Sequence, residues 1–282
     1  MAPWRIPIRS FRPSHECPLR PSPLGLPPVA VATARRAELP PPQTGVCLPP
    51  QPVVTAAMNY DEVIAVEAEP YPFEFMPATC ALLLIDMQRD FLEPGGFGEM
   101  LGNDIAQLRR TIEPNRILLA AWRAHGLQVL HTREGHRPDL GCLPRSKKLR
   151  GRGPTSIGDP GPMGRILVRG EAGHDIIPEL YPLPNEAVID KPGKGAFYAT
   201  DLHAIMQNRG IQQLIVTGVT TEVCVNTTVR EANDRGYDCL VPADCVGSYF
   251  PEFHEAGLNM IKAQGGIFGW VSHSEHILKV LQ

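Results

Sequence analysis

Apolar runs and amphipathic segments alternate along the chain from about residue 78. The continuous apolar run 80–85 predicts a strand that is buried on both faces. Shorter apolar runs predict four further strands, at 127–131, 186–190, 213–217 and 238–241. Helical spacing predicts helices at 105–125, 200–209, 253–264 and 274–281. Strands that alternate with helices imply a mostly parallel sheet covered on both faces, so we predict one α/β domain with α/β/α layers.

The strand at 213–217 leads into the most informative segment of the chain. Gly218 ends the apolar run, two threonines follow, and a helical pattern begins near Glu222. Cys224 therefore falls in the first turn of a helix, where unpaired N–H groups and the helix dipole favour a thiolate. This edge of an open α/β sheet is also where ligands bind. A small buried core cysteine is the alternative, and the local pattern alone leaves the two interpretations open.

Two charged residues directly follow other predicted strands. Asp86 follows the strand at 80–85, and Lys191 follows the strand at 186–190. A buried carboxylate can take a thiol proton, and a nearby ammonium lowers a thiol pKa. Taken singly, Asp86 could be a turn residue or helix cap, and Lys191 a solvated loop lysine. Because Asp86, Lys191 and Cys224 can meet at one sheet edge, we interpret them as a catalytic set.

Two stretches have a different composition. Residues 1–57 are rich in proline and arginine, contain only Glu16 and Glu38 as acids, and lack hydrophobic periodicity, which predicts disorder. Scarce acids suit an organelle transit peptide, whereas the prolines argue against an amphipathic mitochondrial address; Met58 is an alternative start. We therefore divide the chain into a leader, 1–57, and a domain, 58–282. The Gly/Pro/Arg-rich stretch 134–165 is long for a loop and predicts a functional lid or wall.

Composition narrows the function classes. The formal net charge of −3 gives no sign of a nucleic-acid surface, and no apolar stretch approaches a membrane span. The seven cysteines are scattered and odd in number, as in proteins of a reducing compartment. We expect no nucleic-acid or membrane partner, and a cytoplasmic location, or a plastid or mitochondrial one if the leader is a transit peptide. The chain has no CxxC or HExxH motif, so we expect no metal and no cofactor.

Three motifs follow one another in order along the chain: Asp86-x-Gln88, Lys191 ahead of Phe197-x-x-Thr200-x-Leu202, and Gly218-x-x-Thr221-x-x-Cys224-Val225. In these motifs the sequence resembles the isochorismatase-like cysteine hydrolases, from about residue 59 to the C-terminus. The resemblance implies a Rossmann-like α/β fold with Asp86 as general base, Lys191 as its electrostatic partner and Cys224 as nucleophile. It also implies a cis peptide between Val219 and Thr220, and an oxyanion hole formed by the backbone N–H groups of Thr220 and Cys224.

Longer stretches are similar to the biuret amidohydrolase branch of that family: 131–139, 158–161, 175–182, 190–195, 227–236 and 264–269. This similarity implies that the chain hydrolyses biuret to allophanate and ammonia through a covalent cysteine intermediate. It also implies that the amide of Gln264 binds the urea-like substrate, because one amide supplies donors and an acceptor. A solvated helix-end glutamine is the alternative at this position. The family commonly forms dimers or tetramers, so we expect a homo-oligomer.

Other functions are compatible with these motifs. Triuret or ureidoacrylate could replace biuret, because pocket walls rather than the catalytic set decide the substrate. A non-catalytic binding protein could retain the same fold. Nicotinamidases of the superfamily carry a metal site where this chain has Glu134-Gly-His136, but the further histidine is missing and Cys142 falls near its place. Two ligands do not make a stable metal site, so we expect His136 to contact substrate or to be hydrogen-bonded.

Overall fold

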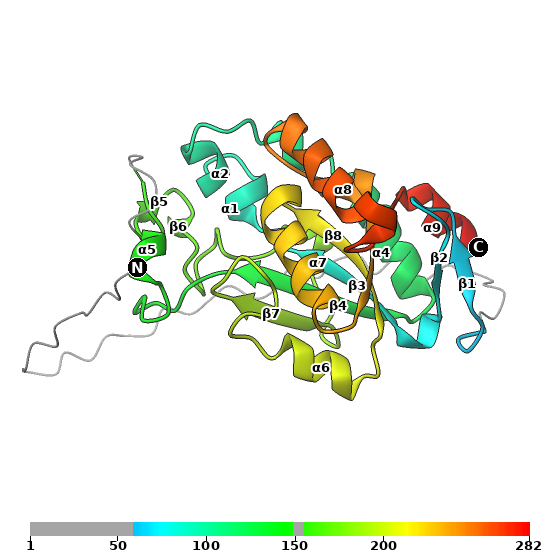
Figure 1. Cartoon of the computed structure of the whole chain (residues 1–282). Coiled ribbons are helices and arrows are strands. Elements are labelled where there is room, and N and C mark those ends of the chain that lie inside the picture. Colours follow the sequence, from blue (N-terminus) through cyan, green and yellow to red (C-terminus); the bar gives the residue numbers. More distant parts are fainter. Residues whose placement is uncertain (1–58, 149–154) are drawn as a thin grey trace, which may run out of the picture. The chain divides into compact units, whose positions relative to one another are not determined.

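A parallel sheet forms the centre of the computed structural model, which describes residues 59–148 and 155–282 (Figure 1). The proposed leader, 1–57, lies outside these residues. Within the described part of the chain the sheet has seven strands in the order β11-β9-β8-β3-β4-β7, with β10 paired to β8, and every pair is parallel. The strands are β3 (Cys80–Ile85), β4 (Gln128–Glu134), β7 (Ala187–Lys191), β8 (Gln213–Val219), β9 (Asp238–Pro242), β10 (Val246–Gly247) and β11 (Trp270–Ser272).

Helices cover both faces of this sheet. The covering helices are α4 (Ile112–Ala124), α6 (Leu202–Asn208), α7 (Asn226–Asn233), α8 (Pro251–Gly266) and α9 (Ser274–Val280). Successive side chains of a strand point to opposite faces. Accordingly, Leu82 and Leu84 of β3 share one apolar cluster with α4 and α9, whereas Leu83 and Ile85 share another with α6, α7 and α8. The predicted three-layer α/β/α fold with a parallel sheet is therefore confirmed (Figure 1).

The predicted helix at 105–125 is wrong in one respect, because it is two helices. α3 (Ala106–Arg109) ends before α4 begins at Ile112. Thr111 lies at the break, where its hydroxyl donates to the carbonyl of Leu108 at 2.8 Å. A threonine side chain that bonds a backbone carbonyl in this way competes with the helical hydrogen-bond ladder. Hydrophobic spacing continues across the break, which is why the pattern suggested a single helix.

Most of the remaining elements are too short to show a period, and the pattern did not predict them. The turn at 221–225 is the exception, because a helical pattern was predicted to begin near Glu222. The strands β1 (Ile64–Val66) and β2 (Phe73–Phe75) form an antiparallel pair, and β5 (Pro160–Gly161) pairs with β6 (Gly164–Arg165). The short helices are η1 (Pro77–Thr79), α1 (Arg89–Leu92), α2 (Phe97–Met100), α5 (Arg145–Lys148), η2 (Pro178–Leu180), η3 (Thr221–Val225) and η4 (Ala243–Cys245). Among the residues that the structure describes, no helix combines the length and the apolar character needed to cross a membrane.

Candidate active site

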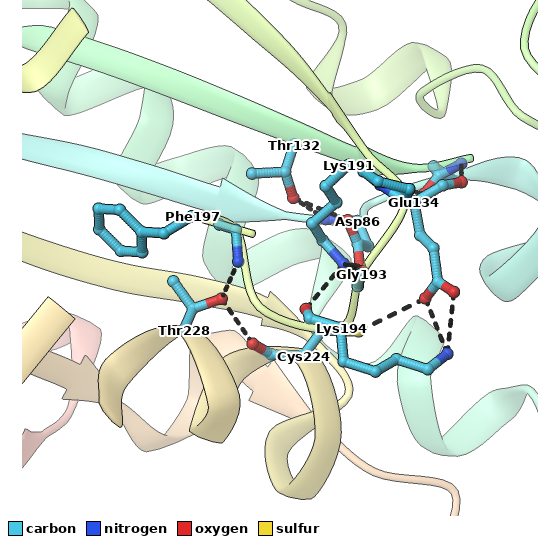
Figure 2. A network of polar contacts seen from close by, with 12 residues as sticks. Asp86, Thr132, Glu134, Lys191, Gly193, Lys194, Phe197, Cys224 and Thr228 are labelled. Atoms are coloured by element: carbon cyan, nitrogen blue, oxygen red, sulfur yellow. Dashed lines mark hydrogen bonds and ion pairs between the residues drawn. The ribbon is translucent and has the colours of Figure 1, made fainter. Parts of the chain in front are cut away.

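Asp86, Lys191 and Cys224 come together at the carboxyl edge of the sheet (Figure 2). The Nζ of Lys191 lies 2.7 Å from Oδ2 of Asp86, and both side chains are completely buried. One carboxylate oxygen of Asp86, one of Glu134 and the Sγ of Cys224 all lie within 4.8 Å of one another. Three strand ends therefore place an acid, an ammonium and a thiol around one point, together with a second acid that the motifs did not single out.

Asp86 is fixed by its backbone and by a neighbouring threonine. Its φ of 51° lies in the left-handed region, which aspartate tolerates better than most residues and which turns the chain away from β3. The hydroxyl of Thr132 donates to Oδ1 of Asp86 at 2.7 Å, and the backbone N–H of Asp86 donates to the carbonyl oxygen of Thr132 at 3.2 Å. With Lys191 on the other oxygen, the carboxylate has a single orientation.

Lys191 is a buried ammonium whose donors are all used. Besides Asp86, its Nζ donates to the carbonyl oxygens of Gly193 at 3.2 Å and Lys194 at 2.9 Å. Burial alone would lower the pKa of Lys191, but Asp86, with Cys224 and Glu134, raises it well above the ordinary value. Lys191 therefore keeps its proton and acts as a fixed positive charge.

Cys224 lies in η3, a single π-helical turn between β8 and α7. The hydroxyl of Thr228 donates to the carbonyl oxygen of Cys224 at 2.7 Å and accepts from the N–H of Ala196 at 3.1 Å, which ties this turn to the Lys191 loop. Burial raises the pKa of the Cys224 thiol well above its usual value; Lys191 lowers it less, and Asp86 adds to the rise. At this position desolvation outweighs the helix start and the ammonium, so the resting group is a thiol whose proton a base must accept.

Glu134, the last residue of β4, is held in place by Gln88 of the Asp-x-Gln motif. The side-chain amide of Gln88 donates to the carbonyl oxygen of Glu134 at 3.0 Å and accepts from its N–H at 2.6 Å. The same amide donates to the carbonyl oxygen of His174 at 2.8 Å. Gln88 is completely buried, so these bonds are shielded from water. The motif thus supplies Asp86 directly and positions Glu134 through Gln88.

The Glu134 carboxylate carries its charge beside the thiol (Figure 2). Lys147 lies 2.6 Å from Oε1, and Lys194 lies 2.9 Å and 3.0 Å from the two oxygens. Burial would raise the pKa of Glu134, but Lys191, Lys194 and Lys147 together lower it to about 2. The Sγ of Cys224 donates to Oε2 at 3.7 Å. In the sequence Glu134 was only a metal-ligand candidate, because the predicted strand ended at 131 and Glu134 did not directly follow it.

The geometry of Asp86, Glu134 and Cys224 could in principle hold a metal ion. Among the described residues, these three have ligand atoms that all lie within 4.8 Å of one another. Lys191 already neutralises Asp86, and two further lysines neutralise Glu134. A cation would therefore meet three ammonium groups, which favours interpreting the cluster as a thiol and substrate site.

His136 is not one of the described residues whose ligand atoms converge in this cluster. Its Nδ1 lies 3.5 Å from the Sγ of Cys142, the residue near the place of the missing histidine. Burial, with Lys147, lowers the pKa of His136 to about 4, so its ring is neutral. His136 thus has a hydrogen-bonded place at the start of the long loop, and its contact with substrate stays a prediction.

Cys224 opens onto a cavity of about 260 Å³. Thr220 lines the same cavity, and the Val219–Thr220 peptide is cis, as the resemblance implied. The oxyanion-hole role of the Thr220 and Cys224 N–H groups stays a prediction. The described residues that line the cavity are Phe91, Phe97, Gly98, Leu101, Asn103, Glu134, Lys194, Val219, Thr220, Glu222, Val223, Cys224, Tyr249 and Phe250.

Gln264 is not brought to Cys224 within this chain. It is exposed, has a φ of 54°, and lies at a kink near the end of α8. It is not among the described residues that line the cavity. Helix α8 begins next to Phe250, at the cavity, and a rise of 1.5 Å per residue carries Gln264 roughly 20 Å from that start. Its role in substrate binding stays a prediction.

Residues 80–275 match the family model of the isochorismatase domain. The chain belongs to the isochorismatase family. It is 31% identical over 228 residues to "Ureidoacrylate amidohydrolase RutB" of Pantoea ananatis (strain LMG 20103), covering 77% of this chain and 88% of that protein. The three motifs of Asp86, Lys191 and Cys224 all fall inside the matched range.

Solved structures of the family share the fold. An isochorismatase family protein from Desulfovibrio vulgaris is 29% identical, with a TM-score of 0.60 over 72% of this chain and 98% of that one. The N-carbamoylsarcosine amidase from Thermoplasma acidophilum is 22% identical, with a TM-score of 0.54 over 70% of this chain and 97% of that one. At that identity the second likeness shows the fold alone.

Proposed function

We propose that this protein is a cysteine amidohydrolase that cleaves the carbamoyl C–N bond of a small urea-like amide. The observation that carries this proposal is the thiol of Cys224, which lies within 4.8 Å of two buried carboxylates and lines a cavity large enough for a small molecule. The name of the 31% identical relative, a ureidoacrylate amidohydrolase, supports the same class of substrate.

The cavity suits a substrate with several N–H donors. Glu134, with a pKa of about 2, is ionised at neutral pH and accepts hydrogen bonds next to the Sγ of Cys224. Glu222 also lines the cavity, and its Oε2 is buried without a hydrogen-bond partner among the residues that the structure describes. A buried acceptor without a partner is costly, and a ureido N–H would satisfy it.

The reaction follows from these positions. Asp86 accepts the proton of Cys224, and the resulting thiolate attacks the carbamoyl carbon. The backbone N–H groups of Thr220 and Cys224 stabilise the tetrahedral oxyanion. Asp86 returns the proton to the nitrogen that leaves as ammonia, and Lys191 holds the Asp86 carboxylate in place throughout. Water that Asp86 activates then cleaves the C–S bond and frees the thiol.

Biuret and ureidoacrylate are the two leading substrates within this class. The sequence predicts biuret, with allophanate and ammonia as products. Ureidoacrylate is favoured by a separate observation, the identity to a relative named for that activity. Triuret is the third candidate. All three present a terminal carbamoyl group to the same thiol, so the proposal covers each of them.

The test is ammonia release from biuret, triuret and ureidoacrylate. We expect turnover of at least one substrate by the wild type and no turnover by Cys224→Ser. Cys239→Ala is the matched control, because Cys239 is also fully buried but is not among the described residues that line the cavity, and it should retain activity. Inactivity of the folded wild type on the whole panel would refute the proposal. Full activity of Cys224→Ser would refute the role of the cysteine.

A further inference from the structure

Four aromatic side chains line the cavity in front of Cys224. Phe91 and Phe97 come from α1 and α2, and Tyr249 and Phe250 come from the segment just before α8. We call these four residues the aromatic wall. The first pair is far from the second pair in the sequence. The two pairs meet because α1 and α2 lie over the same edge of the sheet as the start of α8 (Figure 1).

Tyr249 fixes the aromatic wall in place before any ligand binds. Its hydroxyl donates to the carbonyl oxygen of Phe91 at 3.1 Å, which joins the two segments that carry the wall. Phe91 and Phe97 also pack against a small apolar cluster that includes Ile166 and Leu167. Phe250 remains 42% exposed, at the rim. The wall is therefore a preformed apolar surface with one accessible edge.

The same cavity has charged groups beside the thiol. Glu134, Lys194 and Cys224 line it together with the aromatic wall. One part of the cavity thus suits a ureido group, and another suits hydrocarbon. Biuret has no C–H bond and would leave the aromatic wall without an apolar partner. A hydrocarbon group placed there would gain the free energy of apolar burial.

Building on the proposed function, we propose that the substrate is an N-substituted urea whose hydrocarbon substituent lies against the aromatic wall. Its terminal carbamoyl group lies at Cys224, and its N–H groups face Glu134. Ureidoacrylate, with its carbon–carbon double bond, falls inside this class, whereas biuret falls outside it. The wall then determines specificity, and the groups at the strand ends carry out the chemistry.

The reaction balances without any co-reactant except water. The thiolate of Cys224 forms a C–S bond to the carbamoyl carbon, the bond from that carbon to the terminal nitrogen breaks, and Asp86 protonates the nitrogen as ammonia leaves. Water then breaks the C–S bond and restores the thiol. The N-substituted carbamic acid that is released decomposes to the free amine and carbon dioxide.

The experiment measures kcat/KM for ammonia release from methylurea, ethylurea, propylurea and biuret. Each buried methylene should raise kcat/KM of the wild type about fourfold along the alkyl series. A flat or falling series, with biuret the better substrate, would overturn the inference and leave the proposed function standing. If the folded wild type were inert on all of these compounds, and on triuret and ureidoacrylate as well, the proposed function would fail and this inference with it.

Two exposed phenylalanines provide a matched pair of variants. Phe250→Ser should flatten the dependence of kcat/KM on alkyl length, because it removes the accessible part of the aromatic wall. Phe253→Ser is the control: Phe253 is 47% exposed and its ring centroid lies 5.1 Å from that of Phe250, but it is not among the described cavity residues. It should keep the wild-type dependence. The same flattening in both variants would count against the wall. Thermal unfolding of both checks that they are folded.

Discussion

Two buried glutamates flank the same pair of strands, β4 and β7, at opposite edges of the sheet. Glu134 ends β4 at the carboxyl edge, and Glu186 directly precedes β7 at the amino edge. The pKa of each is lowered to about 2, against the effect of burial, by basic neighbours. The same pKa therefore occurs at the candidate active site and at a site far from the thiol.

The partners of Glu186 engage both of its carboxylate oxygens. Arg123 donates to both oxygens, with Nε and Nη2 each at 2.7 Å. His131 lies 2.9 Å from Oε2, and the N–H of Leu183 donates to the same oxygen at 2.9 Å. A guanidinium matches a carboxylate in a planar two-bond contact, which suits a permanent link between a helix and a strand. Glu186 thus holds α4 to the start of β7.

The partners of Glu134 leave it available. Its neighbours are the ammonium groups of Lys147 and Lys194, which are compact charges on flexible stems, and Oε2 also faces the thiol of Cys224. The side chain of Lys194 is 45% exposed, so it can move without opening the core. A lowered pKa therefore does not by itself mark a functional carboxylate; the geometry of its partners distinguishes the two.

Glu134→Gln should lower the activity far more than the same change at Glu186. It keeps the shape of the side chain but removes the charge that accepts the ureido N–H, so we expect kcat/KM to fall about a hundredfold. Ammonia release at saturating and limiting substrate measures the loss, and thermal unfolding checks the fold. Wild-type kcat/KM in this variant would show that Glu134 resembles Glu186 and has only a structural role.

The thiol of Cys224 should report the charge of Glu134. Because burial raises its pKa, the thiol is protonated at neutral pH, and iodoacetamide should alkylate it at least tenfold more slowly than a free cysteine. The rate should keep rising above pH 8.5, where an ordinary thiol levels off. Glu134→Gln should speed alkylation by removing a nearby negative charge, whereas Glu186→Gln should not. Mass spectrometry of the Cys224 peptide measures the rate, and a plateau near pH 8.5 would contradict a raised pKa.

Glu186→Gln should lower the stability and leave the chemistry unchanged. The neutral amide loses the charge of the bonds to Arg123 and His131, so we expect the free energy of unfolding to fall by about 1 kcal/mol. Urea denaturation gives the stability, and kcat for ammonia release should equal that of the wild type. A large loss of kcat with unchanged stability would reverse the roles assigned to the two glutamates.

Protonation of Glu186 in acid should lower the stability of the protein by a small amount. The folded-state pKa of Glu186 is about 2, below the value of about 4.3 in an unfolded chain. Its ionised form therefore stabilises the fold above about pH 4.3, and this contribution is lost as the pH falls towards 2. Between pH 5 and pH 3 the wild type should lose more stability to urea than Glu186→Gln. Parallel curves for the two proteins would indicate that Glu186 is not the group that titrates.

The sequence revealed the parts of the site that follow apolar strands. Asp86 stands out because a uniformly apolar run precedes it. Cys224 stands out because an apolar run, a glycine and a helix start lead up to it, and Lys191 because it directly follows a short predicted strand. Glu134 was missed because β4 runs three residues beyond the predicted strand end at 131. Those residues are polar, yet Thr132 and Glu134 are completely buried. Tertiary partners such as Gln88 decide this burial, and a single sequence does not list them.

The aromatic wall could not be predicted, for a different reason. Phe91 and Phe97 are separated from Tyr249 and Phe250 by about 150 residues of chain. Periodicity reports only on neighbours within an element, so contacts at this range are invisible to it. Gln264 shows the converse: its match to a family position did not reveal that α8 carries it away from the cavity.

The catalytic groups and most of the cavity lining belong to different parts of the fold, so one can change without the other. Asp86, Glu134, Lys191 and Cys224 are anchored to the central sheet, whereas α1, α2 and residues 249–250 lie outside it. New side chains in these outer segments would alter what the cavity accepts without disturbing the sheet. The catalytic side chains would then stay in place while the cavity lining varies. Exchanging α1, α2 and residues 249–250 should therefore change the substrate preference without changing the reaction.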